Sequence, residues 1–190
     1  MIYFTADWHF NHDREFVYKP RGFDCVEDMN EAIVERHNKI VEVIDTVYIL
    51  GDLCLGGGDR EILNKNKTLI ESLRGNLKII LGNHDTPNRI QMYSECKNVT
   101  VLGYADLIKY RKYHFYISHF PTITSNLSDS ASLKQRTLNL YGHTHQRSNF
   151  FDDNPTMYHV GVDSHGCKPI DICIILAEMH DKIKECINQL

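Results

Sequence analysis

The sequence lacks long apolar runs, closely spaced cysteine pairs and a strong excess of either charge. Its apolar runs, such as Ile172 to Ala177, are far too short to cross a bilayer, so we expect no membrane-spanning segment. Its 6 cysteines are scattered without a CxxC pair, which excludes a zinc knuckle or a thioredoxin-type motif. With 21 Lys and Arg against 25 Asp and Glu, the net charge of -4 provides no basic field for long nucleic acid.

The N-terminal segment, Met1 to Asp7, also lacks a basic region followed by an apolar stretch. We therefore expect a cytoplasmic protein, whose cysteines are free thiols. The 190 residues and the 42% hydrophobic content fit one globular domain over residues 1-190. The one excess is histidine, with 11 residues, and imidazole suits metal and proton chemistry.

The hydrophobic pattern predicts strands that alternate with helices in the first half of the chain and cluster in the second half. A hairpin is expected over Tyr104 to Ser118, with Arg111-Lys112 in the turn. The other predicted strands are Ile2–Thr5, Thr46–Leu50, Leu77–Leu81, Val99–Leu102, Thr137–Tyr141 and Met157–Val162. This order indicates an α/β protein with either one mixed sheet or two stacked sheets, and with helices outside.

Apolar residues at intervals of three and four predict four helices between these strands. They are Val26 to Ile44 capped by Asp24, a helix that begins at Asp59 and ends by Gly75, Pro87 to Cys96, and a last helix from Asp171 to Ile187. His37 falls on the apolar stripe of the first helix, where a packed side chain is expected. The remaining segments Asp7 to Asp24, Gly56-Gly57-Gly58 and Phe120 to Arg136 are predicted to be loops.

Potential metal ligands follow the carboxyl ends of five predicted strands. The residues are Asp7, His9, Asp52, Asn83, His84, Asp85, His119, His143 and His145. In open α/β sheets this edge binds ligands, so the side chains are expected to converge there. Asp, Asn and His suit divalent transition ions, and a group of this size suits two of them.

In chain order these residues form five blocks. The blocks are Asp7-Trp8-His9, Gly51-Asp52, Gly82-Asn83-His84-Asp85, Ser118-His119 and Gly142-His143-Thr144-His145. Together they resemble the calcineurin-like metallophosphoesterases, in a small, cap-less, bacterial or phage-type form. A single block would be weak evidence, but five in order make coincidence improbable. The resemblance implies a two-sheet mixed β-sandwich flanked by helices, in four α/β/β/α layers.

The resemblance also implies two divalent ions, which could be Mn, Fe, Zn or Ni. One ion would be held by Asp7, His9, Asp52 and His145, and the other by Asp52, Asn83, His119 and His143. Asp52 would bridge the ions, since a carboxylate can span two metals about 3.5–4 Å apart. A water between them would become the hydroxide nucleophile.

By the same resemblance, His84 is not a ligand but contacts the phosphate and protonates the leaving group. Asp85 is expected to orient His84. Leu55 stands where the protein Ser/Thr phosphatases have a second Asp, which argues against that branch.

The loop after the first strand carries four candidate substrate-binding residues. They are His12, Arg14, Lys19 and Arg21. An Arg fork matches phosphate well, so these side chains are expected to contact the substrate. The alternative is a solvated basic loop, with His12 either behind the ligands or in solvent.

We expect a metal-dependent phosphoesterase that acts on a small phosphoester or nucleotide-like substrate. A diester is favoured over a monoester because 190 residues leave no room for a cap domain. One alternative is a nuclease of the same superfamily, although the net charge of -4 opposes it. Another is a non-catalytic scaffold, against which the presence of His84 and all seven ligands argues. The apolar stripe of the last helix leaves a homo-oligomer open.

Overall fold

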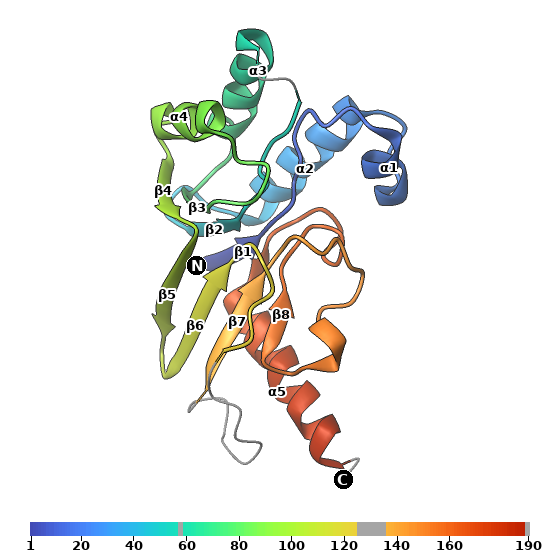
Figure 1. The fold of residues 1–190 in the computed structure, drawn as a ribbon, viewed down its shortest axis with the longest axis vertical. Helices are drawn as coiled ribbons and strands as arrows, with labels where there is room; N and C mark the ends of the chain where they lie inside the picture. Colours follow the sequence, from blue (N-terminus) through green and yellow to red (C-terminus); the bar gives the residue numbers. More distant parts are fainter. Residues whose placement is uncertain (57–58, 125–135, 189–190) are drawn as a thin grey trace.

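The computed structural model describes residues 1–56, 59–124 and 136–188, which contain two mixed β-sheets flanked by helices (Figure 1). The first sheet has the order β4-β3-β2-β1-β9. Its strands are β1 (Ile2–Thr5), β2 (Thr46–Leu50), β3 (Asn76–Ile80), β4 (Val99–Gly103) and β9 (Ile170–Asp171). Strands β1 to β4 are parallel, and β9 is antiparallel to β1.

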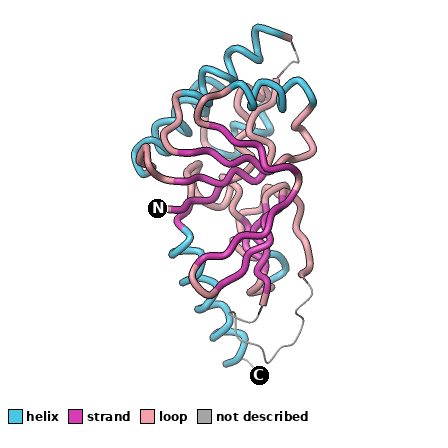
Figure 2. Tube along the Cα trace, turned by 90° about the vertical axis from the view of Figure 1, so that its left-hand side faces the viewer, coloured by secondary structure: helices cyan, strands magenta, loops and turns pink. Residues whose placement is uncertain are grey.

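The second sheet has the order β5-β6-β7-β8. Its strands are β5 (Ala105–Tyr110), β6 (Tyr113–Ser118), β7 (Thr137–Tyr141) and β8 (Met157–His159). The β5–β6 pair is the predicted antiparallel hairpin, and β6, β7 and β8 are parallel. Only Tyr104 separates β4 from β5, so the chain passes directly from one sheet to the other. Figure 2 shows the strands as an upper and a lower group.

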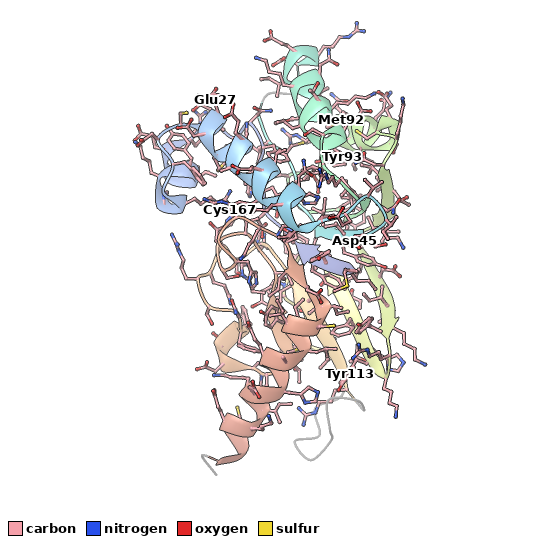
Figure 3. All side chains as sticks on the ribbon, turned by 180° about the vertical axis from the view of Figure 1, so that it is seen from behind. Glu27, Asp45, Met92, Tyr93, Tyr113 and Cys167 are labelled. Atoms are coloured by element: carbon pink, nitrogen blue, oxygen red, sulfur yellow. The ribbon has the colours of Figure 1, made fainter. Side chains whose placement is uncertain are left out.

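Helices lie against both sheets. They are α1 (Glu15–Tyr18), α2 (Val26–Ile40), α3 (Arg60–Glu71), α4 (Pro87–Glu95) and α5 (Ile172–Asn188), with 3-10 turns at Lys19–Arg21 and Phe151–Asp153. Helices α2, α3 and α4 lie above the first sheet and α5 lies beside the second (Figure 1). Seen from behind, α2 crosses the first sheet and α5 lies below it (Figure 3). No helix in the described ranges is long and apolar enough to span a membrane.

Two hydrophobic cores follow from the alternation of side chains along the strands. In β2, Ile49 packs into the core between the first sheet and helices α2 to α4, while Leu50 packs into the core between the two sheets. The second core also contains Ile175 of α5. Because β1, β2 and β3 contribute to both cores, both of their faces are buried and their sequences are almost continuously apolar.

Most predicted elements are present, and the differences lie at their ends. Helix α2 stops at Ile40 rather than Ile44, because Val41 turns to an extended conformation. Its N-cap is Cys25 and not Asp24, since the Cys25 sulfur accepts the backbone N–H of Asp28 at 3.5 Å. Helix α3 begins after Asp59 as expected, but ends at Glu71, before Gly75.

The predicted strand Met157–Val162 stops at His159, because the chain then bends toward the first sheet and Gly161 pairs with Ala6. Strand β9 was not predicted, and the loop Asp7–Asp24 contains α1 and a 3-10 turn. All six cysteines are free thiols. Gly57 and Gly58, and most of the Ser-rich segment 120–136, lie outside the described residues.

Candidate metal centre

The carboxyl ends of strands from both sheets meet at one edge and bring the predicted ligands together. Asp7 and His9 follow β1, Asp52 follows β2, Asn83 follows β3, His119 follows β6, and His143 and His145 follow β7. The edge is therefore built from both sheets, which explains why residues from position 7 to position 145 share one site.

The backbone at these ligands is unusual. Five of the seven predicted ligands have a positive φ, namely Asp7 (58°), His9 (54°), Asp52 (53°), His143 (68°) and His145 (49°). Residues other than glycine rarely adopt this left-handed conformation, which costs on the order of 1–3 kcal/mol each. Such strain is typical of functional sites, where surrounding contacts hold side chains in directions that a relaxed strand end would not give.

Two glycines of the motifs are needed because the ligands lie against them. A Cβ at Gly82 would overlap the Asp52 carboxylate, and a Cβ at Gly142 would come within 2.7 Å of Asp7 Oδ2. The absence of a side chain at these positions allows the backbone to approach the carboxylates closely.

The first group of potential ligands is Asp7, His9 and His145, whose donor atoms lie within 4.8 Å of one another. The Nε2 atoms of His9 and His145 are only 3.2 Å apart. His143 donates its backbone N–H to Asp7 Oδ2 at 2.9 Å, which holds that carboxylate in place. Burial raises the pKa of Asp7 to about 6, against the opposing effect of nearby histidines, and a cation at this position would favour its ionised form.

The second group is Asp7, Asp52 and His119, also within 4.8 Å. His119 Nδ1 lies 2.8 Å from the Leu50 carbonyl, so this nitrogen donates and leaves Nε2 free as a ligand. Asn83 Oδ1 lies 2.9 Å from His119 Nε2, and His143 Nδ1 lies 3.2 Å from the same atom. The structure therefore brings all seven predicted ligands into one cluster.

Asp52 belongs to the second group and lies beside His119 and His84. Its Oδ2 lies 3.4 Å from His119 Nε2, and its Oδ1 accepts the backbone N–H of His84 at 2.9 Å. Burial alone would raise the pKa of Asp52, but hydrogen bonding to His119, the charge of that ring and the His84 N–H outweigh it and lower the pKa to about 2. Two carboxylates, one amide oxygen and four imidazoles form a donor set that fits divalent transition ions.

His84 lies beside the cluster with 45% of its side chain exposed. Its ring centroid is 5.6 Å from that of His9, and its Nε2 is 3.9 Å from Asp52 Oδ2. The His84 carbonyl accepts the guanidinium of Arg89 from α4, which fixes the backbone at this point. The ring can therefore reach a group bound at the cluster while its backbone stays anchored.

Asp85 has a different role from the predicted one. Its carboxylate points away from solvent and accepts the backbone N–H groups of Gly82 at 2.7 Å and Asp52 at 3.1 Å, and the hydroxyl of Tyr93 at 2.7 Å. Burial raises its pKa, although these donors oppose the shift. Asp85 thus braces the loops after β2 and β3 rather than orienting the His84 ring.

Arg21 is buried instead of facing a substrate. Its guanidinium makes two 2.9 Å hydrogen bonds to the Asp163 carboxylate and donates to the backbone carbonyls of Asp7 and Trp8. Asp163 Oδ2 in turn lies 2.8 Å from His145 Nδ1. The pair therefore holds two parts of the ligand cluster in register, and the predicted phosphate contact by Arg21 does not match this geometry.

The other three predicted substrate residues lie near the surface. Arg14 is exposed, and Lys19 pairs at 3.5 Å with the exposed Asp24. His12 is half-buried, with its ring 5.3 Å from that of His9. His12 also lines a cleft of about 420 Å³ beside the cluster, together with His9, His84 and His145.

Three supporting residues were absent from the predicted site: Asp163, Arg89 and Tyr93. Asp163 follows a predicted strand, as the ligands do, so the same positional rule would have found it. Arg89 and Tyr93 are four residues apart on α4, where nothing in the sequence distinguishes them from surface or core residues of a helix.

The comparisons with known proteins agree with one another on the family and the fold of this chain. The model of the calcineurin-like phosphoesterase superfamily domain matches residues 2–181. An uncharacterized protein of Methanocaldococcus jannaschii is 31% identical over 199 residues, which cover 100% of this chain and 97% of that protein. The gene 66 protein of Mycobacterium phage D29 is 27% identical, and the alignment covers 100% of this chain and 96% of the phage protein. The crystal structure of a protein of unknown function from Aquifex aeolicus has a similar fold, with a TM-score of 0.69, 21% identity and coverage of 93% of this chain and 98% of that one.

Proposed function

We propose, from the premise that this chain belongs to the calcineurin-like phosphoesterase superfamily, that it is a metal-dependent hydrolase of phosphodiesters, with phosphomonoesters as the less favoured alternative. The observation that carries the proposal is the pair of three-residue ligand groups that share Asp7 within 4.8 Å. Two adjacent ligand groups suit hydrolysis at phosphorus, where charge must be stabilised on both the attacking and the leaving oxygen.

We assign the first ion to Asp7, His9, Asp52 and His145, and the second to Asp52, Asn83, His119 and His143. Asp52 is assigned as the bridge from the family motif, and its Oδ2 lies 3.4 Å from His119 Nε2. Asp7, which belongs to both groups of close donor atoms, is the alternative bridge. Divalent ions bound there would lower the pKa of a water between them, supplying a hydroxide nucleophile, and would neutralise phosphate oxygens.

The protein's own contribution to the reaction centres on His84. Its exposed imidazole lies beside the ligand cluster and lines the cleft, so it can donate a hydrogen bond to a phosphate oxygen and pass a proton to the leaving oxygen. Its backbone is anchored by Arg89 and by Asp52, which keeps the ring within reach of a bound phosphate.

A preference for diesters is supported by the openness of the site. The cleft beside the cluster extends from His9 to Pro20 and Arg147 on neighbouring loops. Its volume of about 420 Å³ exceeds what a phosphate alone needs and can accept a group attached to the phosphorus. A substrate with a second ester arm would use this space.

The test is hydrolysis of bis-p-nitrophenyl phosphate and p-nitrophenyl phosphate in parallel, with the purified protein before and after removal of metal by a chelator. We expect chelation to abolish both activities, manganese or a similar divalent ion to restore them, and the diester to be the better substrate. Full activity of the metal-free protein would contradict the proposal. Binding of metal without hydrolysis of either ester would instead indicate a scaffold.

A further inference from the structure

An exposed phenylalanine stands next to the proposed catalytic site. Phe16 of α1 is 73% exposed, whereas Tyr18 in the same helix is buried. The rings of Phe16 and His12 form a T-shaped contact with a centroid distance of 5.6 Å, and the His12 ring is 5.3 Å from that of His9. Helix α1 lies to the side of α2, away from the strands of both sheets (Figure 1). Phe16 therefore contributes little to either core, yet it is two rings away from a metal ligand.

Phe16 forms one wall of the cleft of about 420 Å³. Such a volume is within the range of small-molecule sites, about 300–1,000 Å³. Val17 and Pro20 add further apolar surface, and Arg147 lies at the rim, where its guanidinium donates to the Pro20 carbonyl. His9, His84 and His145 also line the cleft.

The lining of the cleft thus combines ligand histidines with a cation and a flat apolar ring, which is linked to His9 through the His12 ring. Arg21 and Asp163 also line it, but they neutralise each other as a buried pair. Arg147 is exposed and keeps donors available for an acceptor on a bound group. An aliphatic arm would use the apolar wall but leave this cation unmatched, whereas a planar heterocycle would match both.

We propose that this cleft binds a planar aromatic group, of the nucleobase type, carried on one ester arm of the substrate, and that Phe16 is the platform on which it stacks. The inference rests on the proposed phosphoesterase function and narrows its substrate class. Every base has an apolar face, so stacking on Phe16 selects for aromatic arms without selecting strongly among bases.

A second exposed ring lies on the other side of the cluster and provides a comparison. Phe120 is 47% exposed and packs against His143 and His119, with centroid distances of 4.7 Å and 5.0 Å. Its position covers two ligand histidines and does not line the cleft. Phe120 is thus the alternative platform, and its substitution distinguishes the two sides of the site.

The experiment measures binding of methyl phosphate and of nucleoside 5′-monophosphates to the manganese-loaded protein by calorimetry. For the variant Phe16→Leu we expect the affinity for a nucleoside monophosphate to fall about tenfold, because stacking on the ring is lost while an apolar side chain of similar size remains. The affinity for methyl phosphate should stay within about twofold, because that ligand contacts only the phosphate end. Phe16→Trp should retain the preference for nucleotides.

Leu107→Ala serves as the control, since Leu107 is a similarly exposed apolar residue on β5, outside the cleft. Equal effects of Phe16→Leu on both ligands, no effect on either, or a loss of selectivity in Phe120→Leu alone would overturn the inference. A wild-type protein that hydrolyses the model esters but binds nucleotides no better than methyl phosphate would overturn this inference and leave the proposed function intact. Absence of both hydrolysis and phosphate binding would overturn both.

Discussion

Among single residues, the proposed metal centre depends most on Asp52 and its negative charge. Asp52→Asn removes one negative charge and leaves an amide, which cannot bridge two cations as a carboxylate does. We expect elemental analysis after dialysis to find a loss of metal from both positions. Asp106→Asn, an exposed carboxylate on β5, is the control and should bind metal as the wild type does. Two tightly held ions in Asp52→Asn would mean that another residue, such as Asp7, is the bridge.

His84 is expected to act in turnover and not in metal binding. His84→Ala removes a half-exposed ring but leaves the backbone N–H that Asp52 accepts. Turnover should therefore fall by about 10²–10⁴-fold, as for loss of a general acid, while metal content is unchanged. Steady-state kinetics measure the loss of turnover, and elemental analysis of the same preparation measures the metal content. Loss of metal together with activity would identify His84 as a ligand instead.

The clustering of the candidate ligands could be predicted because metal-binding residue types followed strand after strand. The contacts that hold these candidate ligands in place could not be predicted. Asp85 follows His84 in the sequence, and only the fold reveals that its carboxylate turns toward the backbone of Asp52 and Gly82. Arg21 is likewise one of several basic residues in its loop, and its pairing with Asp163 joins positions 142 residues apart.

The loop between β1 and α2 is held to the site by this Arg21–Asp163 pair. Arg21→Met should leave Asp163 as a buried, partly unpaired carboxylate and destabilise the fold by about 3–5 kcal/mol. Urea denaturation measures this change in the free energy of unfolding. Lys19→Met, in the same loop, removes only an exposed pair and should cost less than about 1 kcal/mol. Similar values for the two variants would show that Arg21 is not the anchor of the loop.

Helix α2 is tied to the turn before β3 by His37, whose Nε2 lies 2.8 Å from the Arg74 carbonyl. Burial lowers the pKa of His37 to about 4, although the hydrogen bond opposes this shift. Since an unfolded histidine titrates near pH 6.5, the unfolded state binds more protons between pH 6.5 and 4, and stability should fall as the pH falls through this window. The loss attributable to His37 should approach about 3 kcal/mol.

The measurement compares the wild type with His37→Gln, which can still donate to the Arg74 carbonyl but does not titrate. Urea denaturation at pH 7 and at pH 4 should show a stability difference between the two proteins that shifts in favour of the variant at low pH. A difference that is independent of pH would mean that His37 is protonated as easily in the folded protein as in the unfolded one.

Periodicity predicted most of the elements but not where they end. The stripe of α2 continues in sequence through Ile44, but Val43 and Ile44 are 72% and 86% exposed because the helix has already stopped. Strand β9 has two residues and pairs only with β1, which is too short for any pattern to indicate. Such ends depend on contacts between distant segments, which periodicity does not contain.

Over the whole molecule, the two cores share the strands of the first sheet, and the candidate site lies where both sheets end. We propose on this basis that residues 1–190 behave as one domain. Ile49 and Leu50 belong to different cores, so loss of one core would expose a face of the sheet that supports the other. The candidate metal ligands also come from both sheets, so ion binding should stabilise the two halves together.

Trp8 makes the proposal of a single domain testable, because it is the only tryptophan, is fully buried and belongs to the first core. Its fluorescence follows unfolding of that core, whereas calorimetry detects the whole chain. We expect one transition, with the fluorescence midpoint equal to the calorimetric midpoint and an enthalpy of about 130 kcal/mol for 190 residues near 60 °C. Manganese at about 100 times its dissociation constant should stabilise the protein by about 2.7 kcal/mol and shift both midpoints equally. Two calorimetric peaks, only one of which coincides with the Trp8 transition and moves with metal, would show instead that the sheets unfold separately and that the site belongs to one of them.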